Sequence, residues 1–363
     1  MKMNNRERII KTVLGEKTDR PPYFIWFNFK PWKETLDRWL DEGLEKAEDW
    51  NKIQGFDEGV LEIQRDLLGF YPLYKEEVLE DLGEKQIVRD KYGIKKIVGK
   101  NFSSIPQYLD YPVTDMEDWN RLKEERLDPD SPGRFPDNWE ELADYYNNSR
   151  QLIQIGENPY GLFGFCREML GVEEFLISFY TQPELIKDMM DYMTDFWIKI
   201  YSKILKRVRI DQIHMWEDMS GKQGSLISPA FIKEFMLPNY RKISKFSKDN
   251  GIKIFSLDTD GRVDELIPLF MDAGVNMMFP FEVAAGSDVI KFGKEYPGLC
   301  IMGGVDKREI AKGYDAIDRE LERIAPMFER GRYILSLDHG VPPEVSLDNF
   351  KYYCQRAKDY IFG

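Results

Sequence analysis

The sequence predicts an α/β protein, a (β/α)8 TIM barrel, on two observations. From residue 151 onward, short apolar runs rich in β-formers alternate with longer amphipathic stretches, which is typical of parallel βαβ units. Acidic residues follow five consecutive runs, and in such a barrel the carboxyl ends of the strands form the active-site face. The rival architecture, an open doubly wound sheet, is disfavoured because no Gly-x-Gly-x-x-Gly follows any run.

The expected strands follow from their apolar, β-rich composition. Six of them lie at 151–156, 211–216, 252–257, 275–281, 299–304 and 332–337. The run "YFIWFNF" at 23–29 is expected to be a seventh, and one more strand within 30–150 would complete eight. A helix is expected over 5–14, and 85–101 reads as a β-hairpin around Lys91-Tyr92-Gly93.

No low-complexity linker and no internal repeat divides the chain. We therefore expect residues 1–363 to form a single barrel domain. Residues 30–150 do not share the regular alternation of the later part, because they are rich in proline, aspartate and tryptophan. This segment is interpreted as an elaboration that covers the mouth of the barrel.

Charge and apolar patterning restrict the classes of partner. The chain has 51 Lys and Arg against 64 Asp and Glu, a net charge of -13, which argues against a nucleic acid or an anionic membrane surface. It contains no apolar run long enough to span a bilayer, and its start has no signal-peptide core. Three widely separated cysteines without a Cys-x-x-Cys pair suit a reducing compartment, so we expect a cytoplasmic protein.

The residues at the strand ends are the most informative feature of the sequence. Charged groups seldom stand beside a buried strand without a partner or a function. Simple helix N-caps would explain some of them, and this alternative stays open for Asp306, Asp218 and Asp264. The acidic strand ends are Glu217-Asp218, Asp258-x-Asp260, Glu282, Asp306 and Asp338.

One of the two histidines lies in the last of these ends, "YILSLDHGVPPE". Gly340 allows a tight turn there and two prolines fix the exit of the chain, so Asp338 and His339 are expected to face the cavity. An imidazole among carboxylates serves as a metal ligand or as a general acid or base. The other histidine, His214, lies inside an expected strand and is interpreted as a packing residue.

Five stretches carry a resemblance to a known family. They are "RERIIKTVLGEKTDRPP", "WEDMSGKQGSLISPAFIKEFMLPNYRKI", "DTDGRVDELIPLFMDAGVNMMFPFEVAAGSDV", "IMGGVDKREIAKG" and "LDHGVPPEVSLDNF". Together they make the chain resemble the uroporphyrinogen decarboxylase superfamily, and more closely its divergent uroporphyrinogen decarboxylase-like branch related to corrinoid-dependent methyltransferases. The resemblance implies a (β/α)8 barrel.

Two activities follow from the resemblance. The decarboxylases need no cofactor and bind a polycarboxylate in a cationic cleft behind an arginine-rich signature. Here the corresponding stretch reads "YFIWFNFKPWKETLDRW", and the acidic strand ends would repel such a substrate. The turn containing His339 is nevertheless similar to that of the decarboxylases. The methyltransferases move a methyl group between a small substrate and a corrinoid carried by a separate protein, and many bind zinc.

The leading hypothesis is therefore a methyltransferase that moves a methyl group from a small methoxylated substrate to a corrinoid protein, as an O-demethylase component does. Positions that match the zinc-binding motif are Asp258, Asp260 and His339. With Glu217 they form the expected zinc ligand set, and imidazole and carboxylate ligands suit zinc as a Lewis acid. Asp338 is expected to orient His339, and Glu282 is a further catalytic candidate. Candidate contacts of the substrate or the corrinoid are Trp26, Phe27, Trp216, Phe281, Gly303 and Gly304.

The alternative is a cofactor-independent decarboxylase of another acid, which needs a cation facing the leaving carboxylate. The available cations near loops are Arg167, Lys222, Arg262, Lys307 and Arg308. A third reading is a binding protein on a barrel scaffold. Under the leading hypothesis a corrinoid protein is the partner, because the chain lacks an Asp-x-His-x-x-Gly corrinoid-binding signature. The resemblance also implies a homodimer.

Overall fold

The computed structural model describes residues 3–26, 29–55, 57–100 and 106–362. Its centre is a curled sheet of seven parallel strands in the order β1-β6-β7-β10-β11-β12-β13. The strands are β1 Val60–Glu62, β6 Leu152–Ile155, β7 Gln212–Trp216, β10 Ile254–Asp258, β11 Met277–Phe279, β12 Cys300–Met302 and β13 Tyr333–Ile334. All six strands predicted after residue 150 are thus confirmed, and β1 supplies the strand expected within 30–150.

The run at 23–29 does not form the expected strand where the structure describes it. Residues 23–26 carry no strand pairing, and Phe27 and Asn28 lie outside the described residues. The reason is a long-range contact: Asp57 donates its backbone N–H to the Tyr23 carbonyl and accepts the Tyr23 N–H with its side chain. Closure of a full barrel by strand pairing is therefore absent from the described part of the chain. Phe24 and Trp26 instead fill the interior of the sheet.

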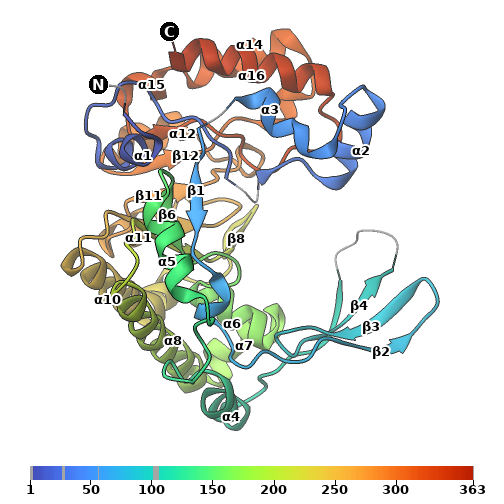
Figure 1. The fold of residues 1–363 in the computed structure, drawn as a ribbon, viewed down its shortest axis with the longest axis vertical. Helices are drawn as coiled ribbons and strands as arrows, with labels where there is room; N and C mark the ends of the chain where they lie inside the picture. Colours follow the sequence, from blue (N-terminus) through green and yellow to red (C-terminus); the bar gives the residue numbers. More distant parts are fainter. Residues whose placement is uncertain (1–2, 27–28, 56, 101–105, 363) are drawn as a thin grey trace.

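Helices cover the outer face of the curled sheet, as Figure 1 shows. They are α6 Leu162–Leu170, α7 Val172–Thr181, α8 Pro183–Ile204, α9 Pro229–Phe231, α10 Leu237–Asp249, α11 Leu266–Asp272, α12 Val289–Glu295, α13 Lys307–Ile310, α14 Tyr314–Ile324, α15 Pro326–Arg330 and α16 Leu347–Phe362. The first helix, α1 Asn5–Leu14, instead packs Ile9 and Val13 against the residues inside the curl. The helix predicted at 5–14 matches α1. Two apolar layers result, one between the sheet and these helices and a smaller one inside the curl.

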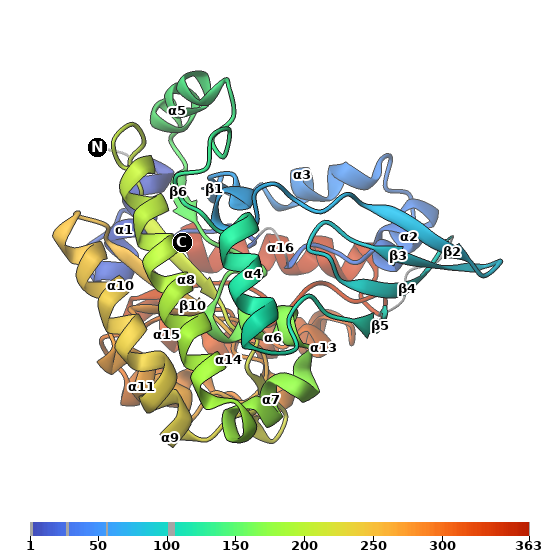
Figure 2. The ribbon, with the colours of Figure 1, turned by 90° about the horizontal axis from the view of Figure 1, so that it is seen from below.

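Residues 30–150 add structure of a different kind. Four antiparallel strands, β2 Glu77–Asp81, β3 Lys85–Arg89, β4 Lys95–Gly99 and β5 Gln107–Asp110, form a separate sheet. The predicted hairpin is confirmed as β3 paired with β4. Figures 1 and 2 show this sheet standing out from the main body. The helices here are α2 Lys33–Asp41, α3 Trp50–Gln54, α4 Met116–Arg126 and α5 Trp139–Asn148.

The segment that contains α2 reaches the end of the barrel at which the strands terminate. Thr35 and Trp39 donate side-chain hydrogen bonds to the carbonyls of Val341 and Val345, in the loop after β13. Gly340 allows this approach, because a Cβ there would lie 2.7 Å from Nε1 of Trp32. Among the described residues, no helix is both long enough and apolar enough to cross a bilayer.

Candidate active site

Three buried side chains meet where β6, β7 and β10 approach their carboxyl ends. Glu157 follows β6, His214 lies within β7, and Asp258 is the last residue of β10. Each offers one oxygen or nitrogen atom, and these three atoms lie within 4.8 Å of one another. The parallel register explains the meeting, because His214 pairs with Ser256 and Asp258 with Trp216 across adjacent strands. We call Glu157, His214 and Asp258 the inner group.

The imidazole of His214 has one nitrogen engaged and one exposed to the inner group. Nδ1 lies 2.9 Å from Oγ of Ser256, whereas Nε2 has no hydrogen-bond partner among the described residues. Nε2 faces Oε2 of Glu157 at 3.8 Å. Burial lowers the pKa of His214 to about 3, so the ring is neutral at pH 7. A neutral imidazole with one nitrogen anchored and the other open is the form that binds a metal ion.

The two carboxylates of the inner group differ in their surroundings, and Asp258 is the one that is poorly compensated. Burial raises the pKa of Glu157 to about 7, although Trp26 Nε1 donates to its Oε2 at 3.1 Å and the Asn158 N–H to its Oε1 at 3.2 Å. Burial, with Asp260 and Glu157 nearby, raises the pKa of Asp258 well above its ordinary value. No hydrogen-bond donor reaches the Asp258 carboxylate within the described chain. A cation placed among these atoms would offset the cost of burying them.

Aromatic rings enclose the inner group. Phe279 stacks on His214 with ring centroids 5.1 Å apart, and Trp26 lies 4.4 Å from Phe279. These contacts keep the inner group out of bulk water. The ligand atoms of Glu157, His214 and Asp258 therefore face one another in a buried space. Phe27, another aromatic candidate, lies outside the described residues.

His339 belongs to a second, more open set of residues nearer the mouth. Its Nε2 lies 3.6 Å from Oδ2 of Asp260, and its ring lies beside Phe29 and the half-exposed Trp32. The nearby Asp260 carboxylate raises the pKa of His339, because it favours the charged imidazolium. Nδ1 of His339 is buried and has no partner in the described residues. This arrangement can hold and release a proton.

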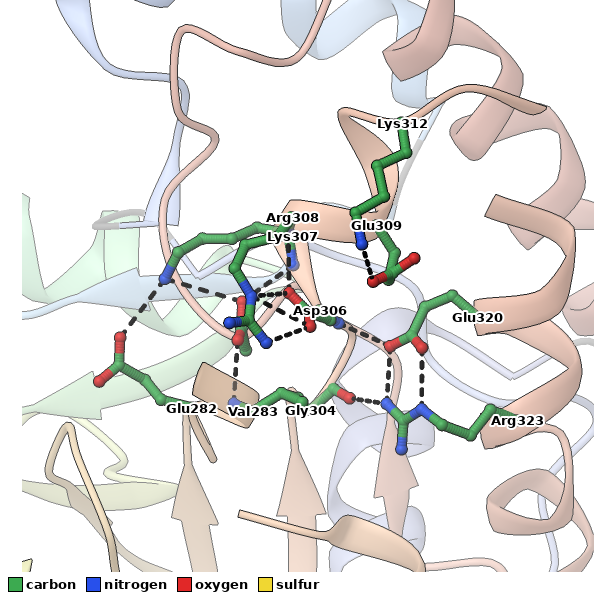
Figure 3. A network of polar contacts seen from close by, with 11 residues as sticks. Glu282, Val283, Gly304, Asp306, Lys307, Arg308, Glu309, Lys312, Glu320 and Arg323 are labelled. Carbon is green, nitrogen blue, oxygen red and sulfur yellow. Dashed lines mark hydrogen bonds and ion pairs between the residues drawn. The ribbon is translucent and has the colours of Figure 1, made fainter. Parts of the chain in front are cut away.

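Glu282 is tied to Lys307 in the loops that surround the mouth (Figure 3), and Asp338 is tied to the same loops. Asp338 accepts the backbone N–H groups of Val283 at 3.0 Å and Lys307 at 3.1 Å. No hydrogen bond from Asp338 to His339 exists among the described residues, so the expected orienting contact is not formed. Glu282 accepts the Gly261 N–H at 3.0 Å and lies 3.3 Å from Nζ of Lys307.

Glu217 points away from the inner group. Its carboxylate is fully buried and accepts the backbone N–H groups of Leu162 at 2.9 Å, Phe163 at 2.6 Å and Gly164 at 3.1 Å. The hydroxyl of Tyr240 donates to the same carboxylate. Burial raises its pKa to about 7, and these four hydrogen bonds act in the opposite direction. The expected zinc ligand set is thus divided: Asp258 is in the inner group, Asp260 and His339 lie outside it, and Glu217 binds α6.

The proposed corrinoid contacts have different surroundings. The guanidinium of Arg167 lies over the ring of Trp216, with its Cζ 4.9 Å from the ring centroid. Trp216 is partly exposed. Phe281 is buried against Phe292 of α12 and does not line the mouth. Gly303 and Gly304 let the backbone approach neighbouring segments closely. A Cβ on Gly303 would lie 2.0 Å from the Pro280 carbonyl oxygen, and a Cβ on Gly304 would lie 2.2 Å from the Val289 side chain.

The cations considered for a decarboxylase are mostly neutralised. Arg167 binds Asp218 at 2.7 Å, Arg262 binds Asp264 at 3.1 Å, and Arg308 binds Asp306 at 2.6 Å. Lys307 lies between Glu282 and Asp338. Asp306 also caps α13 by accepting the Arg308 N–H, as the alternative for that residue predicted.

Two members of the inner group were missed as site residues in the sequence. Glu157 follows the first of the regular strands and could have been found as one more acidic strand end. His214 was interpreted as a packing residue. Its position was in principle available from the two-residue period of a strand, because His214 and Trp216 share a face and Glu217 lies on the opposite one.

This geometry defines an enzyme-like class: a curled parallel sheet with titratable groups at its carboxyl-end mouth. The model of the family "Uroporphyrinogen decarboxylase (URO-D)" matches residues 98–360, so the chain belongs to the uroporphyrinogen decarboxylase family. The family expected from the sequence stretches is therefore confirmed.

Curated relatives agree with this membership. Uroporphyrinogen decarboxylase of Hydrogenobaculum sp. (strain Y04AAS1) is 20% identical over 220 residues, which cover 57% of this chain and 61% of the relative. The enzyme of Rhodococcus erythropolis (strain PR4 / NBRC 100887) is 22% identical over 215 residues, 53% of this chain and 56% of the relative. The chain thus spans less than two thirds of these relatives.

A solved structure shares the fold along nearly the whole chain. It is a methyltransferase from Methanosarcina mazei, with a TM-score of 0.61, 16% sequence identity and coverage of 98% of both chains. At this identity the likeness establishes a common fold.

Proposed function

We propose that this protein is a metal-assisted methyltransferase that moves a methyl group from a small methoxylated substrate to a corrinoid carried by a separate protein. The observation that carries the proposal is the inner group, three buried ligand atoms within 4.8 Å. The fold shared with a methyltransferase adds support.

Glu157, His214 and Asp258 would hold the metal ion, which we propose to be zinc. Two carboxylate oxygens and one imidazole nitrogen form a ligand set that zinc accepts, with a further position left for a substrate. The unpartnered Nε2 of His214 and the uncompensated Asp258 carboxylate fit this assignment. When bound, zinc supplies Lewis acidity toward the substrate oxygen that carries the methyl group.

The other residues of the mouth act on the substrate and its proton. Trp26 and Phe279, both buried, exclude water from the inner group. His339, held by Asp260, donates a proton to the oxygen that loses its methyl group. In the demethylation the methyl–oxygen bond breaks with its electron pair on oxygen, which takes the proton from His339 and leaves as an alcohol or phenol. The corrinoid of the separate protein, in its reduced cob(I) state, would supply the electron pair that accepts the methyl group.

Decarboxylation remains the second candidate because the family model and the curated relatives are named for it. It requires a cation facing the leaving carboxylate. Four of the five candidate cations, all except the exposed Lys222, are held by carboxylates, which disfavours an anionic substrate beside them.

The test combines elemental analysis with a turnover screen. Purified protein should contain about one zinc per chain, and methoxylated aromatics should lose methyl groups only when a corrinoid protein is present. Release of carbon dioxide from a carboxylic acid by metal-free protein would overturn the proposal in favour of decarboxylation.

A further inference from the structure

Glu217 occupies a position between the two segments that carry the carboxylates of the inner group, Glu157 and Asp258. Its backbone N–H donates to the carbonyl of Asp258 at 2.9 Å, at the end of β10. Its side chain binds the first turn of α6, directly after the loop 156–161 that carries Glu157. One residue therefore touches both carboxylate-bearing segments without contributing an atom to the inner group.

The loop that carries Glu157 is packed closely on β7. A Cβ on Gly156 would lie 2.1 Å from the His214 carbonyl oxygen, and Cβ atoms on Gly161 and Gly164 would lie 2.0 and 2.2 Å from that of Trp216. The Trp216 N–H donates to the Tyr160 carbonyl at 3.2 Å. Such close approach leaves little room to adjust, so a shift of the first turn of α6 is transmitted to the loop.

Both oxygens of the Glu217 carboxylate are needed as acceptors. Oε1 accepts the Leu162 N–H and the Tyr240 hydroxyl, and Oε2 accepts the N–H groups of Phe163 and Gly164. A glutamine offers one acceptor oxygen and one amide group that only donates. In Glu217→Gln, the side-chain NH2 group would therefore face a backbone N–H of α6, and the repulsion between the two donors would push the first turn of α6 outward.

We infer that Glu217 is a positioning residue of the metal centre, which fixes the Glu157 loop relative to Asp258 by binding α6 and β10 at once. The inference rests on the proposed function, because it assumes that Glu157, His214 and Asp258 bind a metal ion. It assigns to Glu217 an effect on metal affinity and ligand geometry through the loop, with no direct bond to the ion.

Asp211 offers a matched control on the same strand. It precedes β7 at the opposite end, about 20 Å from Glu217 at the rise of a strand. Like Glu217 it is a buried carboxylate that ties elements together, accepting Arg6 at 2.6 Å and the Ile153 N–H at 3.0 Å. An acid-to-amide change at Asp211 should destabilise the fold without moving the inner group.

The experiment measures zinc affinity by competition with a chelating dye, and the electronic spectrum with Co²⁺ in place of zinc. It compares the full wild-type chain with Glu217→Gln and Asp211→Asn. We expect Glu217→Gln to weaken zinc binding by about 10–100-fold, the usual effect of removing a group that orients a ligand, and to shift the Co²⁺ bands. Asp211→Asn should lower the melting temperature while keeping the wild-type affinity and spectrum.

Three results would overturn the inference, and they are distinguishable. Unchanged affinity and spectrum in Glu217→Gln would remove Glu217 from the centre while the metal site itself stands. Equal weakening in Asp211→Asn would reduce the effect to general destabilisation. A wild-type chain that binds neither ion would instead refute the metal centre of the proposed function. Should Glu217→Gln not fold, Tyr240→Phe provides the same comparison, with a smaller loss of affinity expected because three backbone donors remain.

Discussion

Two carboxylates at the ends of neighbouring strands show how different two buried acids can be. Glu217 follows β7 and Asp258 ends β10, and both are almost completely hidden from solvent. Four donors satisfy Glu217, whereas no donor of the described chain reaches the carboxylate of Asp258. A buried acid with its donors in place stabilises a fold, and one without them needs a proton, a cation or a substrate. The difference separates a scaffold residue from a candidate ligand.

The largest effect is expected from Asp258→Asn. Loss of a ligand should weaken zinc binding by more than about 100-fold, beyond the range for groups that only orient ligands, and should abolish turnover. The metal-free variant should be at least as stable as the metal-free wild type, because a buried charge without donors has been removed. Competition titration and urea denaturation measure these two quantities. Retained zinc affinity would remove Asp258 from the ligand set, and a marked loss of stability would make it a scaffold residue like Glu217.

His339→Ala tests whether the residues near the mouth act separately from the inner group. The rate of methyl transfer should fall by about 10²–10⁴-fold, the usual contribution of a general acid, with the zinc content unchanged. Steady-state turnover and elemental analysis of the same preparations check this. Near-normal turnover would remove His339 from the mechanism, and loss of zinc would make it a ligand after all.

In the metal-free protein, Glu217→Gln should lower the free energy of unfolding, whereas Asp258→Asn should not. Leaving buried backbone donors of α6 unpaired should lower the free energy of unfolding by about 1–3 kcal/mol in the metal-free protein. Urea denaturation of both variants in a chelating buffer gives the comparison. Equal stability of Glu217→Gln and wild type would contradict the scaffold role assigned to its four hydrogen bonds.

The smallest effect concerns an acid that is paired near the surface. Arg8 donates two hydrogen bonds to Asp19 and lowers its pKa from 3.8 to about 2. The folded pKa is lower than the unfolded one, so this stabilisation is present above pH 3.8 and is lost as the pH falls toward 2. Asp19→Asn should reduce stability at pH 6 by less than about 1 kcal/mol, with a difference from wild type that shrinks on acidification. A difference that grows at low pH would reverse the assigned sign.

Much of the fold could be predicted because its signals are local. The runs "QLIQIG" and "DQIHMW" are apolar and β-rich, and both formed strands at nearly the expected positions. The run at 23–29 has the same composition but no strand where it is described. Its partner there is the Asp57 side chain and backbone, more than 30 residues away, and no local pattern encodes that contact.

The candidate site was predicted less completely. The acidic strand ends directed attention to Asp258, Asp260, Glu282 and His339, of which the structure brings Asp260 and His339 together and places Asp258 in the inner group. The sequence could not separate Glu217 from Asp258, because both are acids that follow an apolar run. Nor did it bring Glu157 to His214, which lie 57 positions apart on adjacent strands.

By itself, the sequence determined the order of strands and helices, the family, and the concentration of acids at one end of the sheet, since periodicity and composition act over a few residues. The tertiary structure decided which acids are satisfied. Strand register and the curl of the sheet turn His214 inward and Glu217 outward, and the backbone N–H groups of α6 reach Glu217 alone. Whether a buried carboxylate is a scaffold or a ligand depends on donors brought from distant parts of the chain, and only folding supplies them.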